Sequence, residues 1–269
     1  MTLEQIAASK QEGLDTIGED FGKKVDKSQE ELLAILLLLL SSLSYDTEGN
    51  LVSSTDNYAR VEALMAEFKD AVSRSSYYDA LVFLANRIDK QADLTKEYYK
   101  KLGLDPGLAS EVGYEEQMAS MFDDLTNLET NLYAYIRNFI LASIASGSAR
   151  SLLEGGISDI MVGGGPDKKG RLFNMAVLTA DTMFAVIDRS FTYALGKALG
   201  IKKFRYAGGL VNDSRPFCVA RDGKVFDEGA IRSWGRLGDW KGKIPGTDEA
   251  TIFIYLGGYR CRHWLVPQV

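Results

Sequence analysis

Two short segments near the carboxyl end hold every soft metal-binding side chain of this 269-residue chain. The first segment runs from Asp213 to Cys218, and the second runs from Gly257 to His263. Cys218 and Cys261 are the only cysteines, and His263 is the only histidine. Thiolate sulfur and imidazole nitrogen are ligands that Zn²⁺ prefers. If the fold brings both segments together, these three side chains could hold a zinc ion, with Asp213 or water as the fourth ligand.

The spacing of these residues leaves other interpretations open. If Tyr259 to Trp264 is extended, Cys261 and His263 project from the same face, because side chains alternate along a strand. The chain contains no Cys-x-x-Cys pair, and its Cys-x-His spacing is not that of a zinc knuckle. A buried free thiol beside a hydrogen-bonded histidine, or a disulfide between Cys218 and Cys261, are therefore alternatives to the metal site.

Catalysis by the same side chains is a further alternative. A cysteine nucleophile would need His263 as its base and a third group, such as Asp213, to orient the histidine. Metal-dependent nucleases that use histidine normally assemble several histidines and acidic residues, whereas this chain has a single histidine. We therefore predict that the protein is not an enzyme. The alternative is a metal-dependent nuclease or toxin-like effector that uses Cys218, Cys261 and His263.

The overall composition, 46% hydrophobic and 25% charged, is that of a soluble globular protein. A net charge of −6 argues against a general electrostatic attraction to nucleic acid. Two cysteines do not make the disulfide framework of a small secreted protein. The segment Met1–Gln5 lacks the basic start of a signal peptide, so we expect the chain to fold in a reducing cytoplasm.

One apolar run resembles a membrane segment. Leu32–Leu40 contains only leucine, isoleucine and alanine, between acidic residues and serines. Crossing a bilayer takes roughly 20 apolar residues, so the run is too short. We expect a helix that is buried on nearly all sides or that packs against another chain, and we do not expect membrane contact.

Apolar residues recur at helical spacing through most of the chain. Val61, Leu64, Phe68 and Val72 form one such stripe, and Ser54 could cap its helix. Further stripes predict helices around Leu81–Ile88, Tyr114–Ser146 and Arg171–Gly200.

Beyond residue 200 the pattern changes to that of short strands. Phe204–Tyr206 and Thr251–Leu256 are rich in aromatic and β-branched residues, which favours strands. Asp222-Gly223 predicts a tight turn in a small hairpin between Val219 and Val225. The sequence therefore predicts a mainly α protein with a long-helix N-terminal region and a small α+β C-terminal domain.

We divide the chain into three parts. Residues 1–154 form a helical region for docking or oligomerisation, residues 155–170 a glycine-rich linker or loop, and residues 171–269 the α+β domain. The glycines of the loop lack the Gly-Lys-Ser/Thr ending of a nucleotide-binding loop.

A series of features along the last third of the chain follows the pattern of one known family. They are a helix through Ile187 and Tyr193, the strand Phe204–Tyr206, Asp213, Arg215, Cys218, the turn Asp222-Gly223, the closing segment Gly257–His263 and Pro267. On these residues, the region from about Phe184 to Val269 resembles the phage Mu F-like family of minor head proteins, also called the head morphogenesis domain. Two departures from the family pattern stand out: Arg221 occupies the place of a second cysteine, and His263 replaces the last cysteine of a Cys-Arg-Cys ending.

This resemblance implies a non-enzymatic phage virion component, with residues 171–269 as the head morphogenesis domain. Such a protein would be a portal-associated minor head protein, made in the host bacterial cytoplasm, and would act in head morphogenesis and in genome packaging or ejection. Its partners would be the portal protein and other capsid proteins, with self-association through the N-terminal helices and packaged DNA nearby without specific recognition. The family-like metal cluster would be reduced to Cys218, Cys261 and His263. No cofactor is expected apart from the zinc that these residues could hold.

Overall fold

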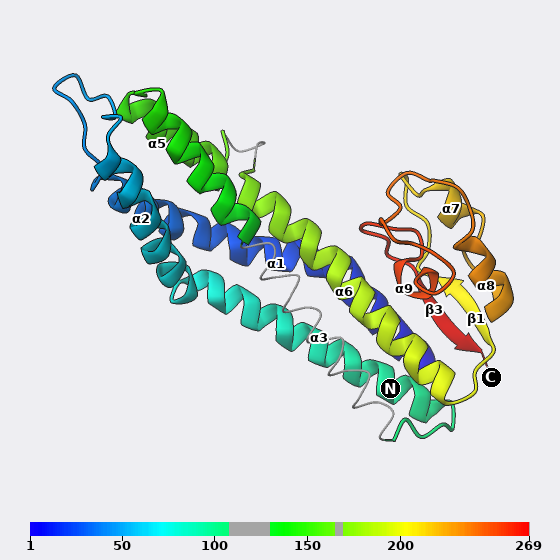
Figure 1. Ribbon diagram of the computed structural model, residues 1–269. Helices are drawn as coiled ribbons and strands as arrows, with labels where there is room; N and C mark the ends of the chain where they lie inside the picture. Colours follow the sequence, from blue (N-terminus) through cyan, green and yellow to red (C-terminus); the bar gives the residue numbers. More distant parts are fainter. Residues whose placement is uncertain (108–129, 165–168, 269) are drawn as a thin grey trace. The chain divides into compact units, whose positions relative to one another are not determined.

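The computed structural model describes residues 1–107, 130–164 and 169–268, and Figure 1 shows their helices and strands. The described residues confirm a mainly helical chain with a small α+β part at its C-terminal end, and residues 130–145 are helical as well. The long helices are α1 (Leu3–Leu40), α2 (Thr55–Ser73), α3 (Ser76–Lys101), α5 (Arg150–Met161) and α6 (Arg171–Ala198). The C-terminal elements are β1 (Lys203–Ala207), α7 (Pro216–Val219), β2 (Val225–Asp227), α8 (Glu228–Trp234), α9 (Ile252–Tyr255) and β3 (Trp264–Gln268).

Helix α2 forms as its apolar spacing predicts. Its stripe, Val61, Leu64, Phe68 and Val72, is buried throughout. Ser54 is the N-cap residue, and its side chain accepts a hydrogen bond from the backbone N–H three residues later. The helices predicted at 81–88 and from residue 171 are also present, as parts of α3 and α6. The expected helix over 114–146 is helical at 130–145, and its earlier part lies outside the described residues.

The apolar end of α1 is less buried than its composition predicts. Leu32, Leu36 and Leu40 are buried, at the four-residue spacing of one helix face. Leu38 lies on another face and is 72% exposed, so burial on nearly all sides is wrong for this helix. Across the described residues, every helix is too short or too polar to be a candidate for spanning a bilayer.

By their contacts, the described residues divide into two units that do not follow the three-part division by sequence. One unit contains residues 1–18, 85–107 and 180–268, and the other contains residues 19–84, 130–164 and 169–179. The N-terminal helix α1 thus contributes residues to both units, because one long helix can enter two cores along its length.

The expected linker at 155–170 is wrong in its first part, because α5 continues to Met161. Glycine usually weakens a helix, but a side chain at Gly156 would meet Phe139, with its Cβ 2.2 Å from the ring Cζ. The close approach of a neighbouring aromatic ring therefore explains a glycine inside this helix. Residues 165–168 of the expected loop lie outside the described residues.

The C-terminal sheet has three antiparallel strands in the order β2-β1-β3. In the register, Arg205 lies opposite Val225 on one side and Val266 on the other. The strand predicted at Phe204–Tyr206 is therefore confirmed as the centre of the sheet. The hairpin predicted from Val219 to Val225 is wrong, because Val219 belongs to α7 and β2 pairs with β1.

The second predicted strand, over 251–256, is also wrong, because these residues form the short helix α9. Its start is set by local hydrogen bonds: the Asp248 carboxylate accepts from the backbone N–H groups of Ala250 and Thr251. Such side-chain bonds to the local backbone compete with strand pairing. The helix ends at Leu256, which adopts a left-handed φ of 43°.

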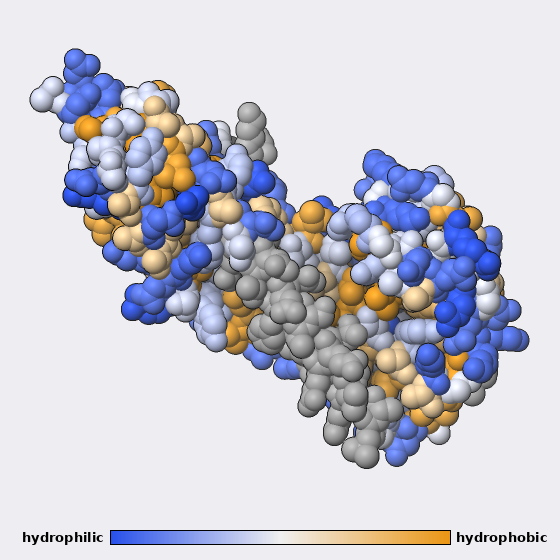
Figure 2. Space-filling model, in the orientation of Figure 1, coloured by the Kyte–Doolittle hydropathy of each residue, from blue (hydrophilic) through white to orange (hydrophobic). Residues whose placement is uncertain are grey.

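An aromatic core joins the sheet to α3 and α6 within the first unit. It contains both cysteines, and Trp234 packs edge-on against Tyr206 of β1 and Phe226 of β2. In the view of Figure 2, the surface over α7 and α8 is mostly hydrophilic, so this core is covered by polar side chains on that face. The core thus places the two cysteine-bearing segments beside β1.

Candidate metal centre

The segment that carries Cys218 folds into the one-turn helix α7. Arg215 precedes the helix in an extended conformation, and Pro216 occupies its first turn, where the missing N–H costs nothing. Phe217 and Cys218 are the buried residues of this helix. The position of proline therefore sets the start of the turn that directs Cys218 into the core.

The segment that carries Cys261 and His263 is held by a buried arginine from α6. Arg189 Nε donates a hydrogen bond of 2.8 Å to the carbonyl of His263, and its guanidinium also donates to the carbonyl of Cys261. A third bond, of 3.1 Å, reaches the carbonyl of Ile254. Arg189 is only 2% exposed, so its bonds to the loop are shielded from water. One side chain thus positions the backbone of both candidate ligands.

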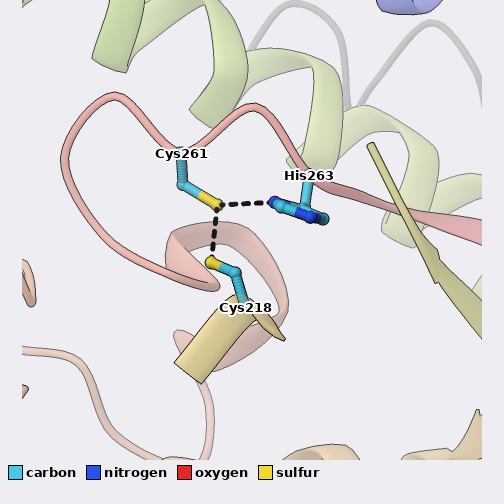
Figure 3. A group of neighbouring side chains, drawn as sticks. All are labelled: Cys218, Cys261 and His263. Carbon is cyan, nitrogen blue, oxygen red and sulfur yellow. Dashed lines mark hydrogen bonds between the residues drawn. The ribbon is translucent and has the colours of Figure 1, made fainter. Parts of the chain in front are cut away.

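Cys218, Cys261 and His263 meet in one buried cluster, as shown in Figure 3. Their ligand atoms all lie within 4.8 Å of one another. The two sulfurs are 4.0 Å apart, and Cys261 Sγ lies 3.8 Å from His263 Nδ1. Tetrahedral zinc would separate two sulfurs by about 3.8 Å and a sulfur from a nitrogen by about 3.6 Å. The two pairs that share Cys261 therefore fit a zinc ion after shifts of a few tenths of an ångström. The remaining pair, Cys218 and His263, lies within 4.8 Å and would have to close by up to about 1 Å.

The other ring nitrogen of His263 faces a carboxylate. His263 Nε2 lies 3.3 Å from Asp222 Oδ1, off the line of a good hydrogen bond. A carboxylate in this position favours the tautomer in which Nδ1 is free to bind a metal. The ring of Tyr206 stacks on the imidazole, with ring centroids 4.7 Å apart, and fixes its plane. The histidine is thus oriented by two neighbours, in the manner of a metal ligand.

The two thiols have opposite tendencies to ionise. The pKa of Cys261 is lowered well below its usual value, because Cys218 hydrogen-bonds to it and because Arg189 and His263 lie close, although burial acts in the other direction. The pKa of Cys218 is raised by the same hydrogen bond and by burial. Cys261 is therefore the thiol that would ionise first and supply a thiolate to a bound metal.

Tyr206 supports the sulfurs from β1. Its hydroxyl donates a hydrogen bond of 3.4 Å to Cys218 Sγ and lies 3.7 Å from Cys261 Sγ. Burial raises the pKa of Tyr206 well above its usual value, so the phenol stays protonated and remains a donor. Hydrogen bonds to sulfur are typical of the surroundings of metal-binding thiolates.

Close packing around the sulfurs also depends on a glycine. A Cβ atom at Gly257 would lie 2.6 Å from Cys218 Sγ and 2.8 Å from Cys261 Sγ. Both distances are too short for any side chain. The glycine of the closing segment therefore leaves the space that the two sulfurs occupy.

The structure brings the three candidate ligands together, as the zinc hypothesis requires, but it does not bring the proposed fourth group to them. Asp213 is exposed and does not belong to the cluster. Arg215, two residues later, donates to the carbonyl of Tyr259. The two cysteines are free thiols in this structure. Of the supporting residues, Asp222 was assigned only to a turn, and Arg189 and Tyr206 were missed.

Comparison of the chain with protein-family models, with curated proteins and with solved structures gives no match in any of the three. The chemistry of the site therefore rests on its own residues. If a zinc ion were held by Cys218, Cys261 and His263, it would crosslink α7 to the segment before β3. With three protein ligands, it would keep one coordination position for water or another ligand.

Proposed function

We propose that the protein is a non-enzymatic minor head protein of a phage virion. In this proposal it associates with the portal protein and other capsid proteins and acts in head morphogenesis and in genome packaging or ejection. The observation that carries the proposal is the convergence of the two segments on which the resemblance depends. Cys218 of the first segment meets Cys261 and His263 of the second, and Arg215 donates to the carbonyl of Tyr259. The two segments follow a helix and a strand, in the expected order.

The candidate metal centre has a structural role in this proposal. All three ligands are buried, as is usual where a metal replaces part of a small hydrophobic core. The four C-terminal elements around the centre are short, between three and five residues for β1, α7, β2 and α9. A zinc crosslink would stabilise such short elements more than their own hydrogen bonds do.

The helical part would supply the docking surface. Leu38 of α1 and Leu152 of α5 are 72% and 68% exposed, which is unusual for large apolar side chains of helices. Both belong to the second unit, and we propose that they contact the portal or another copy of the chain. Packaged DNA would lie nearby without specific recognition.

The test is mass spectrometry of purified particles from the source phage, or of portal complexes co-expressed with the chain. The expected result is recovery in a low and fixed ratio to the portal protein. Leu38→Gln should reduce this recovery, whereas Ala66→Gln, at an exposed position of α2, should leave it unchanged. Absence of the protein from both particles and portal complexes would overturn the proposal.

A metal-dependent nuclease or toxin-like effector is the second candidate. It is favoured by a cavity of about 370 Å³ whose lining includes Cys218, Cys261 and His263. In that case the fourth coordination position of a bound metal would face a substrate. This candidate requires metal-dependent cleavage of DNA or RNA that His263→Ala abolishes. The same protein without any cleavage of either nucleic acid would exclude it.

A further inference from the structure

The cavity beside the candidate metal centre has a basic lining that neither the resemblance nor a structural role for zinc explains. Its volume is about 370 Å³. The chain as a whole carries a net charge of −6, so a concentration of cationic side chains at one cavity is not a consequence of composition. The charged and hydroxyl side chains of the lining are Asp213, Ser214, Arg215, Lys241, Arg260 and Arg262.

Two of the four cations are already paired with carboxylates of the helices. Arg260 Nε lies 2.9 Å from Asp181 of α6, and Arg262 lies 2.5 Å from Asp15 of α1. These pairs fix the backbone that carries both arginines along the cavity wall. Arg262 keeps one unused donor, because its Nε is buried without a hydrogen-bond partner.

The other two cations have donors to spare. Lys241 is exposed and makes no hydrogen bond or ion pair with any of the described residues. Arg215 donates to the carbonyl of Tyr259, and a guanidinium has five N–H groups in all. Ser214 accepts a hydrogen bond of 2.7 Å from the N–H of Val211, which leaves its own O–H to donate.

The lining therefore offers an ammonium, a guanidinium and a hydroxyl toward one space. The lining contains one carboxylate, that of Asp213, for the two cations without an ion pair, Arg215 and Lys241. These three side chains together therefore carry a net positive charge. Arginine and lysine together with a hydroxyl are the side chains that bind tetrahedral phosphate oxygens. The volume of the cavity exceeds what a bare phosphate needs, and so leaves room for the group to which a phosphate is attached.

We propose that this cavity binds a phosphate group through Lys241, Arg215 and Ser214. The phosphate is either free orthophosphate or the terminal phosphate of a nucleic-acid strand, which present the same oxygens. The proposal does not depend on the proposed function, because it concerns donors of this cavity and not association with a particle.

The test is isothermal titration calorimetry of the full-length protein with orthophosphate. We expect binding at one site per chain, weakened at least about tenfold by Lys241→Met and by Arg215→Lys. Lys202→Met is the matched control, because Lys202 is an exposed lysine of the same unit outside the cavity, and it should bind as the wild type does. Circular dichroism of each variant verifies that the fold is retained.

A second arm distinguishes the two sources of phosphate. A short single-stranded oligonucleotide is titrated with and without a 5′-phosphate. Preference for the phosphorylated strand identifies a nucleic-acid end as the ligand, whereas binding of orthophosphate alone identifies a free phosphate. The proposal is overturned if the wild type binds neither orthophosphate nor the phosphorylated strand. It is also overturned if Lys241→Met and Arg215→Lys bind as tightly as Lys202→Met.

Discussion

A buried ion pair between α1 and α6 provides the most direct test of how the unit formed by residues 1–18, 85–107 and 180–268 is packed. The side chains of Lys10 in α1 and Asp188 in α6 are 0% and 1% exposed, with Lys10 Nζ 2.6 Å from Asp188 Oδ1. Lys10 also donates to Thr192 Oγ1 at 3.2 Å and lies 4.8 Å from the centre of the Trp264 ring. Burial lowers the pKa of Lys10, and the attraction of Asp188 opposes that change.

Removal of the ammonium alone should be costly. In Lys10→Met, Asp188 would remain as a buried carboxylate without its cation, and its Oδ2 already lacks a hydrogen-bond partner. Breaking one side of a buried pair costs about 3–5 kcal/mol. Replacing both partners by apolar residues of similar volume is often close to neutral. The double variant Lys10→Met/Asp188→Leu should therefore be more stable than either single variant, by at least about 2 kcal/mol.

The assay is urea unfolding followed by tryptophan fluorescence. All three tryptophans lie between residues 234 and 264, so the signal reports on the unit that contains the pair. Arg236→Met is the control, because Arg236 pairs with Glu249 at the surface of the same unit. Exposed pairs contribute at most about 1 kcal/mol. A Lys10→Met variant that loses no more stability than Arg236→Met would refute the description of Lys10 and Asp188 as a buried, mutually dependent pair.

Three further predictions concern the candidate metal centre and its surroundings. Gly257→Ala places a methyl group against both cysteine sulfurs, so it should lower the free energy of unfolding by urea by about 1–3 kcal/mol. The control Gly238→Ala, whose methyl group would meet no atom within 4 Å, should lower it by less than about 1 kcal/mol. Equal costs would contradict the packing at Gly257. In a chelator competition assay, the chain should bind one Zn²⁺, Cys261→Ser should bind it at least about tenfold more weakly, and the affinity of the wild type should fall from about pH 8 to about pH 6, because the ligands must lose their protons. Unchanged zinc affinity in Cys261→Ser would exclude the site. Burial raises the pKa of Asp181, and Arg260 only partly opposes this, so its carboxyl contributes stability that is present below the unfolded pKa of about 3.9 and is lost as the pH rises to the folded value. Across that window the free energy of unfolding should fall for the wild type relative to Asp181→Asn, and parallel pH profiles would show that the carboxyl is not desolvated.

Patterns that depend on neighbours along the chain were predictable from the sequence. The buried stripe of α2 and its Ser54 cap follow from spacing and from hydrogen bonds within four residues. The three candidate ligands were identified because they are the only cysteines and histidine. By contrast, β-branched and aromatic residues over 251–256 predicted a strand, and the side-chain bonds of Asp248 produced a helical turn instead. A strand propensity based on residue types does not account for local side-chain hydrogen bonds such as those of Asp248.

Patterns that depend on distant neighbours were not predictable in the same way. From the sequence alone, Gly156 predicts an interruption of the helix, and only the structure shows that Phe139 packs against it. Tyr206 is an ordinary strand residue until its hydroxyl meets the two sulfurs. In both cases the amino-acid type fits the position for a tertiary reason, and the sequence around it carries no sign of the partner.

Helix α6 nevertheless contains a signal that sequence reasoning could have used. Between its first and last turns, its only charged residues are Asp181, Asp188 and Arg189. Each is engaged with another segment: Asp181 with Arg260, Asp188 with Lys10, and Arg189 with one carbonyl of α9 and two of the segment before β3. Charges are seldom placed on an apolar helix without partners, because their desolvation is costly. Isolated charges within an apolar helix therefore mark the positions at which that helix fixes other segments, and here they mark the helix that positions the candidate metal centre.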